Sequence, residues 1–257
     1  MIFKFRVLTV ILSVFMMSVS CNDDLDEVLQ DFEKASRDRL FESVEIIKDG
    51  EDSDSQKYSF TYDEDNTLIK FTDSDSDAGP ITLLYDDDKL TNFKEVADKI
   101  FYSDLIINPY QGEYKKFVID RIGYNGTGNN PDWIKMDLTD KENITKHVYV
   151  DINYDLQPNI YKPYLMSGGI VEAADQVLSP KEREAYFTSK LLAKNNPLTI
   201  NFQNGNDELE HMYTIQYDFD EDKRRVNKAV ITYFDFTTGQ SPVADVTTVI
   251  YSYLKDN

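Results

Sequence analysis

The feature that most constrains the fold is an alternation of apolar and polar residues with a period of two. In the segment 213–219, tyrosine, isoleucine and phenylalanine occupy every odd position, and polar residues occupy the even ones. Segments 58–62 and 148–154 follow the same rule with β-branched and aromatic residues. Such alternation is typical of strands that bury one face and expose the other. The chain is therefore predicted to be mainly β.

Clusters of Asp and Asn separate these segments. Asp63-Glu64-Asp65-Asn66 and Asp86-Asp87-Asp88-Lys89 each interrupt an alternating run, and Asp220-Glu221-Asp222 follows a third. Asp and Asn favour turns because their side chains bind nearby backbone amides and tolerate left-handed conformations. Short strands joined by such turns predict an antiparallel β-meander that forms a curved sheet or an open barrel.

The alternation disappears between residues 156 and 197. Ser179 followed by Pro180 and Glu182 has the pattern of a helix start, with an N-cap serine, a proline in the first turn and a capping-box acid. We expect a helical insertion around 171–194. No stretch of flexible-linker composition divides the chain here, so residues 40–257 are predicted to form a single β-rich domain that contains an insertion at 156–197.

The N-terminal end has the composition of a targeting segment. Lys4 and Arg6 precede an apolar run at 7–17, and the small residues Ser18 and Ser20 flank Val19 before Cys21. This apolar run is short for a membrane span and suits a signal peptide over residues 1–20. Segment 18–21 resembles the lipobox of bacterial lipoproteins, although Ser18 replaces the usual branched aliphatic residue. The resemblance implies lipidation of Cys21, the single cysteine of the chain, and hence anchoring to a membrane.

The residues after Cys21 are acidic. Asn22-Asp23-Asp24 resembles the export signal of Bacteroidetes-type surface lipoproteins, which implies an outer-membrane lipoprotein exposed at the cell surface, with the periplasmic face as the alternative. Apolar residues then recur at helical spacing from Leu25 to Phe32. Residues 21–39 are therefore expected to form either a short amphipathic helix or an acidic tether.

The charge of the chain excludes one class of partner. The formal charge is −20, and removing residues 1–20 with their two basic residues would make it −22. Because phosphate binding depends on Lys and Arg, we expect no nucleic-acid partner.

The best metal candidate is the alternation of Asp73, Asp75 and Asp77, which resembles the start of a calcium loop. Ala78 stands where that loop needs glycine, and Leu84 stands where it needs a bidentate glutamate, so a solvated acidic loop is the preferred interpretation and no cofactor is expected. The two histidines, His147 and His211, are both expected to be solvated rather than metal-bound.

A repeated unit of alternating aromatics, Tyr-Asp, a turn and a short apolar strand occurs at 58–71, 81–93, 150–161 and 213–231. Segments 154–159 and 195–198 add to it. Together they resemble a family of uncharacterised Bacteroidetes lipoproteins with Tyr-Asp hairpin repeats on a curved antiparallel sheet. That resemblance implies a lipid anchor and a β-meander, and it implies no catalytic residue.

The sequence favours a non-enzymatic envelope protein that binds a protein or glycan partner through its sheet face or loops. The alternatives are a glycan-directed hydrolase with paired carboxylates and a structural spacer. Acid pairs cannot be selected from 47 acidic residues by pattern alone. Tyrosines on the wet face would suit sugar or peptide binding, but Tyr213 and Tyr217 fall on the apolar phase, and the single tryptophan, Trp133, gives a glycan site little support.

Overall fold

A computed structural model describes residues 39–49, 55–74, 79–93, 95–96, 109–110, 116–124, 130–140, 143–170, 173, 195–221, 225–238 and 242–255. These residues belong to one compact unit, Arg37–Asn257. The predicted signal peptide, Cys21 and the acidic segment that follows it lie outside the described residues.

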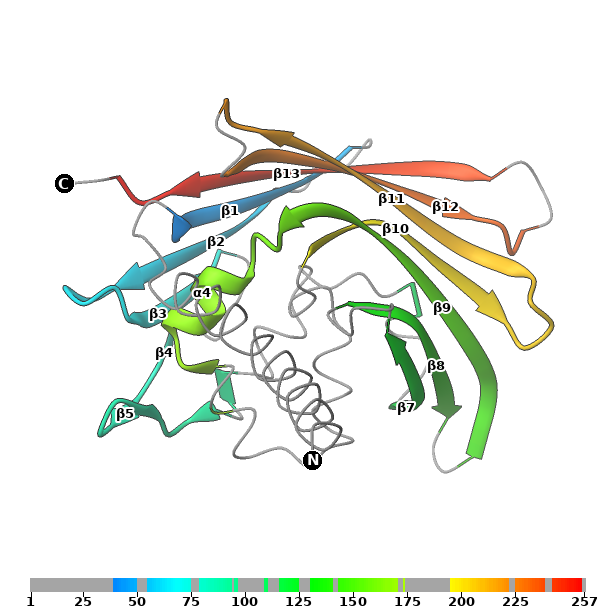
Figure 1. Ribbon diagram of the computed structural model, residues 1–257, viewed down its shortest axis with the longest axis horizontal. Helices are drawn as coiled ribbons and strands as arrows, with labels where there is room; N and C mark the ends of the chain where they lie inside the picture. Colours follow the sequence, from blue (N-terminus) through cyan, green and yellow to red (C-terminus); the bar gives the residue numbers. More distant parts are fainter. Residues whose placement is uncertain are drawn as a thin grey trace, which may run out of the picture. The chain divides into compact units, whose positions relative to one another are not determined.

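Most of the described chain is in strands, which are joined into one large antiparallel sheet and a separate two-stranded hairpin (Figure 1). In chain order, the strands are β1 (Phe41–Lys48), β2 (Ser55–Tyr62), β3 (Leu68–Asp73), β4 (Ile81–Thr82), β5 (Tyr85–Asp86), β6 (Lys89–Leu90), β7 (Lys116–Tyr124), β8 (Pro131–Asp140), β9 (Asn143–Pro158), β10 (Asn195–Asn204), β11 (Leu209–Phe219), β12 (Val226–Asp235) and β13 (Val243–Tyr253). The prediction of a mainly β chain with a curved antiparallel sheet is confirmed.

The sheet has the order β4-β3-β2-β1-β13-β12-β11-β10-β9-β8-β7. Within the run β1 to β4, and within the run β7 to β13, strands that are consecutive in the chain pair with each other. The two runs are joined because the first and last strands pair, with Val44 opposite Tyr251 and Ile46 opposite Val249. The sheet is therefore made of two meanders that join where β1 pairs with β13, and its two open edges are β4 and β7.

Irregular registers accompany the curvature of the sheet that Figure 1 shows. Register shifts occur in the β1–β13, β8–β9, β9–β10, β10–β11 and β11–β12 pairs. An extra residue on one strand of an antiparallel pair bends that strand and increases its local twist. The 16-residue strand β9 consequently arches over much of the fold.

The turns follow the chemistry expected from Asp and Asn. The Asp63 carboxylate accepts hydrogen bonds from the amides of Asp65 and Thr67, at 3.0 and 2.8 Å. In the β10–β11 hairpin the Asn204 side chain likewise accepts from the amides of Asn206 and Glu208. The left-handed positions in these two turns are taken by Asn66 and Asp207, with φ of 65° and 62°. Both residues are of the types that adopt this conformation most readily among non-glycines.

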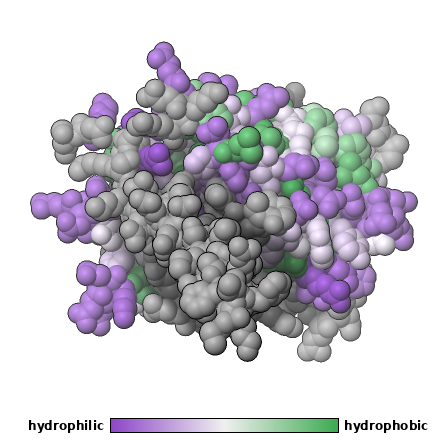
Figure 2. Space-filling view, viewed as in Figure 1, coloured by the Kyte–Doolittle hydropathy of each residue, from purple (hydrophilic) through white to green (hydrophobic). Residues whose placement is uncertain are grey.

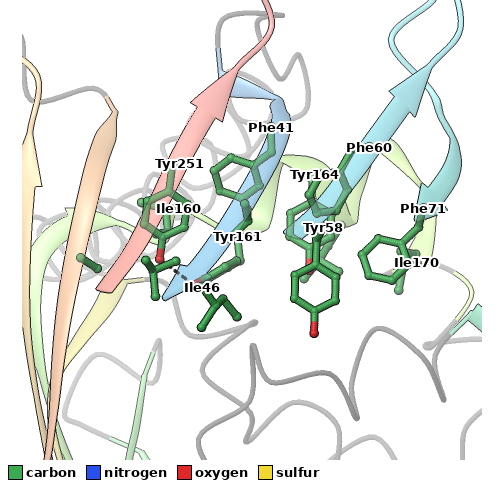
Figure 3. Close-up of a cluster of buried hydrophobic side chains, with 14 of the residues drawn as sticks. Phe41, Ile46, Tyr58, Phe60, Phe71, Ile160, Tyr161, Tyr164, Ile170 and Tyr251 are labelled. Atoms are coloured by element: carbon green, nitrogen blue, oxygen red, sulfur yellow. Dashed lines mark hydrogen bonds between the residues drawn. The ribbon is translucent and has the colours of Figure 1, made fainter. Parts of the chain in front are cut away.

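The inner face of the sheet carries an aromatic core (Figure 3). Phe41 on β1 is fully buried and lies at its centre. Five rings have centroids within 5.3–6.0 Å of the Phe41 ring, namely Phe60, Tyr161, Tyr164, Tyr251 and Tyr253. Tilted and edge-on arrangements dominate this cluster, as the ring quadrupoles favour. Tyr213 and Tyr217 also pack on the inner face, as their phase predicted.

The segment after β9 forms the helical part of the inner layer. Helix α4 (Lys162–Ser167) has Pro163 in its first turn and buries Tyr164 and Leu165 against the core. Strands β9 and β10 each extend three residues into the predicted insertion 156–197. The predicted helix start at Ser179 lies outside the described residues.

Candidate binding surface

Four residues lie directly opposite one another on the outer face of β7, β8, β9 and β10. The register places Gly123 opposite Trp133, Trp133 opposite Asp151, and Asp151 opposite Asn201. All four alternate with inward residues such as Ile134, which is buried. We call this line of four the outer row. Its members are one strand spacing apart, about 4.8 Å for neighbouring strands.

Gly123 provides the surface on which Trp133 lies. A Cβ added to Gly123 would stand 2.2 Å from Nε1 of Trp133 and 2.3 Å from Cε2, closer than any real contact. The pyrrole part of the indole therefore covers the glycine directly. Trp133 nevertheless keeps 39% of its surface exposed. A glycine inside a strand often marks such a close approach.

Asp151 is the carboxylate of the outer row. Partial burial raises its pKa above the ordinary aspartate value, and the negative charges of Asp132 and Asp207 add to this effect. Within the described part of the chain, Asp151 forms neither a hydrogen bond nor an ion pair. It is therefore a hydrogen-bond acceptor without a donor among the described residues.

Asn201 is a second acceptor in the same line. Its Oδ1 atom is buried and has no hydrogen-bond partner among the described residues. A buried polar atom without a partner costs free energy, so such atoms are uncommon in folded proteins. Two residues further along β9 and β10, the Asn153 side chain donates to the Thr199 hydroxyl at 2.9 Å, so that amide has a partner.

Basic and acidic groups are mixed around the outer row. Arg121 and Lys135 face each other across β7 and β8, two residues from Gly123 and Trp133. Lys135 binds Asp120 at 2.9 Å. The local surface thus lacks the single sign of charge that the composition of the whole chain would suggest.

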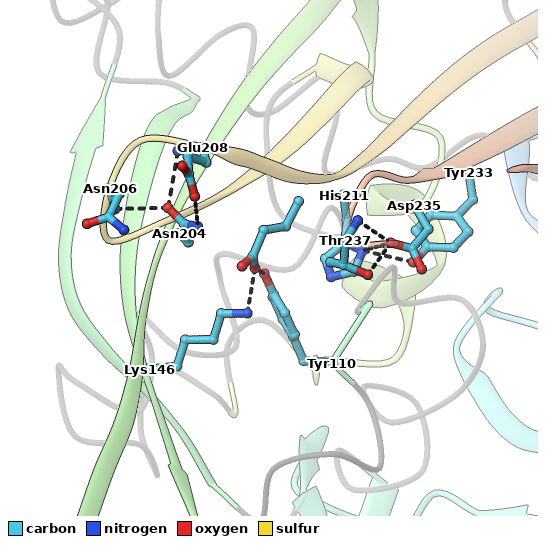
Figure 4. A network of polar contacts seen from close by, with 10 residues as sticks. Tyr110, Lys146, Asn204, Asn206, Glu208, His211, Tyr233, Asp235 and Thr237 are labelled. Carbon is cyan, nitrogen blue, oxygen red and sulfur yellow. Dashed lines mark hydrogen bonds and ion pairs between the residues drawn. The ribbon is translucent and has the colours of Figure 1, made fainter. Parts of the chain in front are cut away.

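A polar network joins β9, β11 and β12 on the inner face of the sheet (Figure 4). Lys146 on β9 forms an ion pair with Glu210 on β11, and the Tyr110 hydroxyl donates to Glu210 at 2.8 Å. Burial acts to raise the pKa of Glu210, but the bonds from Lys146 and Tyr110 outweigh it and hold that pKa below its ordinary value. The Lys146 ammonium also lies 4.9 Å from the centre of the Tyr110 ring.

His211 extends this network, and the expectation that it is solvated is wrong. It is 6% exposed, and its ring packs edge-on against Tyr110 with the centroids 4.9 Å apart. Its Nδ1 lies 2.9 Å from the Tyr233 hydroxyl and 3.8 Å from the Asp235 carboxylate. His147 is exposed, as expected, and pairs with Asp137 at 2.7 Å.

The groups of the inner network bind one another. Tyr110 comes from the long connection between β6 and β7, and it contacts Glu210, His211 and the ring of Phe202. These contacts fix the connection to the inner face of β10 and β11. We interpret the network as a structural clamp.

A second clamp joins two segments that the sequence analysis singled out, 154–159 and 195–198. The Asn196 side chain donates to Asp155 and to the Pro158 carbonyl, both at 3.1 Å, and accepts from the Ile160 amide at 2.9 Å. Burial raises the pKa of Asp155, although its hydrogen bonds from Asn196 and Gln157 oppose the change. One buried amide thus fixes the chain where β9 turns towards α4.

Asp151 and Asp155, two aspartates whose pKa burial raises, do not form an acid pair with each other. Asp151 and Asp155 are four residues apart on β9, which is about 13 Å along an extended strand. Glycosidase acid pairs stand about 5–10 Å apart. Asp155 is also held by the Asn196 clamp.

The structure describes only some of the other candidate site residues that the sequence predicts. Cys21, Asn22, Asp23 and Asp24 lie outside the described residues, as do Asp75 and Asp77. Asp73, at the end of β3, accepts hydrogen bonds from Gln56 at 3.1 and 3.2 Å. Among the described residues, no cluster of three or more His, Cys, Asp or Glu side chains could hold a metal ion. The helices in that part of the chain include none that is long and apolar enough to cross a membrane.

The visible described surface is mainly hydrophilic, with hydrophobic groups in small patches (Figure 2). Most exposed large hydrophobic residues are single aliphatic or aromatic side chains, and such scattered residues are normal on a protein surface. The outer row differs because an exposed tryptophan lies beside Asp151, a carboxylate without a donor among the described residues. The fold and this surface together define a curved-sheet protein with a candidate binding row.

No known protein family matches the chain, and no characterised protein matches its sequence. Among solved structures, it is similar to a porin-like protein from Bacteroides uniformis, with 12% identity, a TM-score of 0.38, and coverage of 83% of this chain and 98% of that one. It is also similar to a LolA superfamily protein from Nitrosomonas europaea, with 11% identity, a TM-score of 0.27, and coverage of 89% and 94%. A third similarity is to a putative outer membrane lipoprotein-sorting protein domain from Vibrio parahaemolyticus, with 11% identity, a TM-score of 0.26, and coverage of 89% and 90%. At these values the similarities carry no functional argument.

Proposed function

We propose that this chain is a lipoprotein of the bacterial cell envelope whose β domain is a non-catalytic binding module. Its lipid would be attached to Cys21 and would hold the protein at the outer membrane. The domain would face the cell exterior, with the periplasm as the alternative. The basic, apolar and small residues before Cys21 and the acidic residues after it support this placement.

The observation that carries the binding function is the outer row. It combines an exposed indole in a fixed position with the neighbouring carboxylate of Asp151, which lacks a donor among the described residues. Binding sites commonly pair an aromatic surface with a few polar groups that fix orientation. A structural spacer has no need for such a surface. The partner would be a protein or a glycan.

The anchor is tested by labelling cells with an alkyne-tagged palmitate. The natural chain should incorporate label and sediment with membranes, whereas a Cys21→Ala variant should do neither. Membrane side is tested by adding protease to intact cells that express either the natural chain or an Asp23→Ala, Asp24→Ala variant. Cleavage of the natural chain alone supports surface exposure, and protection of both supports the periplasm.

The binding function is tested with the purified full chain in detergent micelles, titrated onto isolated cell envelopes. Saturable binding without turnover of envelope polysaccharide supports a binding module. Turnover would favour the hydrolase, and neither binding nor turnover would favour a spacer.

A further inference from the structure

We infer that the outer row is a carbohydrate-binding site, in which a neutral sugar ring stacks on Trp133 and one of its hydroxyls donates to Asp151. This inference rests on the proposed binding function and specifies the chemical class of its ligand.

The indole of Trp133 has the properties of a sugar platform. Because its pyrrole ring lies across Gly123, the side chain is held against the sheet and loses little freedom when a ligand binds. The exposed 39% of the residue provides an apolar, electron-rich surface. One face of a pyranose carries C–H groups with partial positive charge, which this surface attracts. An aliphatic side chain at the same position would supply only contact area.

The Asp151 carboxylate complements the remaining atoms of a sugar. It has no hydrogen-bond donor among the described residues, and it lies on the strand next to Trp133, about 4.8 Å away. A hydroxyl of the stacked ring, or of a ring linked to it, would supply a donor at this distance. The Oδ1 atom of Asn201 is buried and is out of reach of a ligand.

The charges around the outer row favour a neutral ligand. Asp151 is acidic, and partial burial and the nearby charges of Asp132 and Asp207 raise its pKa. Arg121 and Lys135, in contrast, lie two residues from the row on the neighbouring strands. A strongly basic peptide would meet these two cations, and an acidic polymer would meet Asp151 and a chain of net charge −20. A neutral polyhydroxylated ligand meets neither difficulty. We therefore prefer a neutral oligosaccharide to a charged peptide or polysaccharide.

The chain contains its own reporter for this site, because Trp133 is its single tryptophan. The experiment is a fluorescence titration of the full chain in detergent with neutral gluco-, manno-, galacto- and xylo-oligosaccharides, followed by titration calorimetry. We expect at least one class to change the tryptophan emission saturably. If no sugar changes the emission or produces heat of binding, the inference is overturned.

Variants separate stacking from general loss of structure. Trp133→Ala should weaken calorimetric binding by about tenfold or more, as expected for loss of an aromatic stacking partner. Gly123→Ala keeps the tryptophan but forces the indole away from the sheet, so it should weaken binding similarly and shift the emission of the free protein. Asp151→Asn should also weaken binding, and circular dichroism should show an unchanged β content in all three variants.

Leu84→Ala is the matched control, since Leu84 is 53% exposed and follows β4 at the opposite edge of the sheet. It should bind like the natural chain. Sugar binding that survives Trp133→Ala at full affinity would contradict the inference. If the chain binds a purified envelope protein saturably while every sugar is inert, the carbohydrate inference fails and the binding function stands.

Discussion

The hydroxyls of Tyr161 and Tyr251 lie 2.7 Å apart in the centre of the core, where they join the start of α4 to the last strand. Both rings also pack edge-on against each other and contact Phe41 (Figure 3). Burial raises the pKa of Tyr161 to about 12, against the opposing effect of its bond to Tyr251. Two segments that are 90 residues apart in the chain are thus linked by one buried hydrogen bond.

Replacing either tyrosine of this pair by phenylalanine should lower stability. Tyr251→Phe removes one buried hydrogen bond and should cost about 1–2 kcal/mol of unfolding free energy. The double variant Tyr161→Phe, Tyr251→Phe should cost less than the two single changes added together, because no hydroxyl is then left without its partner. Urea unfolding measures these values. Tyr149→Phe, on the outer face, is the control and should change stability by less than about 0.5 kcal/mol. Strict additivity would contradict the coupling.

The Glu210 ion pair should make stability depend on acid. Because its interactions lower the Glu210 pKa in the folded chain, they stabilise the fold at pH values above the ordinary glutamate pKa of 4.5, and this contribution is lost as the pH falls through the lowered value. Glu210→Gln should therefore lower the melting temperature at pH 7 and have a smaller effect near pH 3. Glu208→Gln, an exposed change in the adjacent hairpin, is the control. An equal loss at both pH values would argue against the ion pair.

The Asn196 clamp should tolerate neither loss of its amide nor addition of charge. Asn196→Ala leaves Asp155 and the Ile160 amide without their partner and should cost about 2–3 kcal/mol. For a domain of this size that corresponds to a fall in melting temperature of about 4–12 °C. Asn196→Asp should be worse at neutral pH, because it places a second carboxylate beside Asp155, and should recover partly in acid. Asn206→Ala, at an exposed turn position, should melt like the natural chain.

Calcium should have no effect on the fold. The described member of the acidic triplet, Asp73, is bound to Gln56, and the sequence departs from a calcium loop at Ala78 and Leu84. Scanning calorimetry of the full chain with EDTA and with excess calcium should give the same melting temperature. A higher melting temperature in calcium, abolished by replacing Asp73, Asp75 and Asp77 with asparagine, would establish the metal site instead.

The period-two pattern and the Asp/Asn turns predict much of the sheet because both are local signals. Strands β2, β9 and β11 lie where the alternation places them, and Asp63 and Asn66 have the turn roles expected of them. The pairing of β1 with β13 could not be predicted, because no local signal joins Val44 to Tyr251 across the whole domain. The open edge between β4 and β7 follows from the same long-range pairing.

The sites were harder to predict for a related reason. The His211 ring packs against Tyr110, a residue 101 positions earlier in the chain. Its neighbours in the sequence, Glu208 and Glu210, are acidic and favour a solvated position, so they give no sign of this burial. Trp133 has meaning only through its partners across strands, Gly123 and Asp151. Gly123, a glycine inside strand β7, is the one local sign of a close approach. The glycine can be related to Trp133 only when the register of β7 and β8 is known, and sequence patterns alone fix strand register poorly.

The most direct test of the account compares binding of four full-length chains to isolated cell envelopes: the natural protein, Gly123→Ala, Trp133→Ala and Leu84→Ala. If the outer row is the binding surface, the natural chain and Leu84→Ala should bind saturably with the same affinity. Gly123→Ala and Trp133→Ala should lose at least about 90% of this affinity, a difference of about 1.4 kcal/mol in binding free energy. Equal binding by all four chains, or by none, would contradict the claim that the outer row is the binding surface.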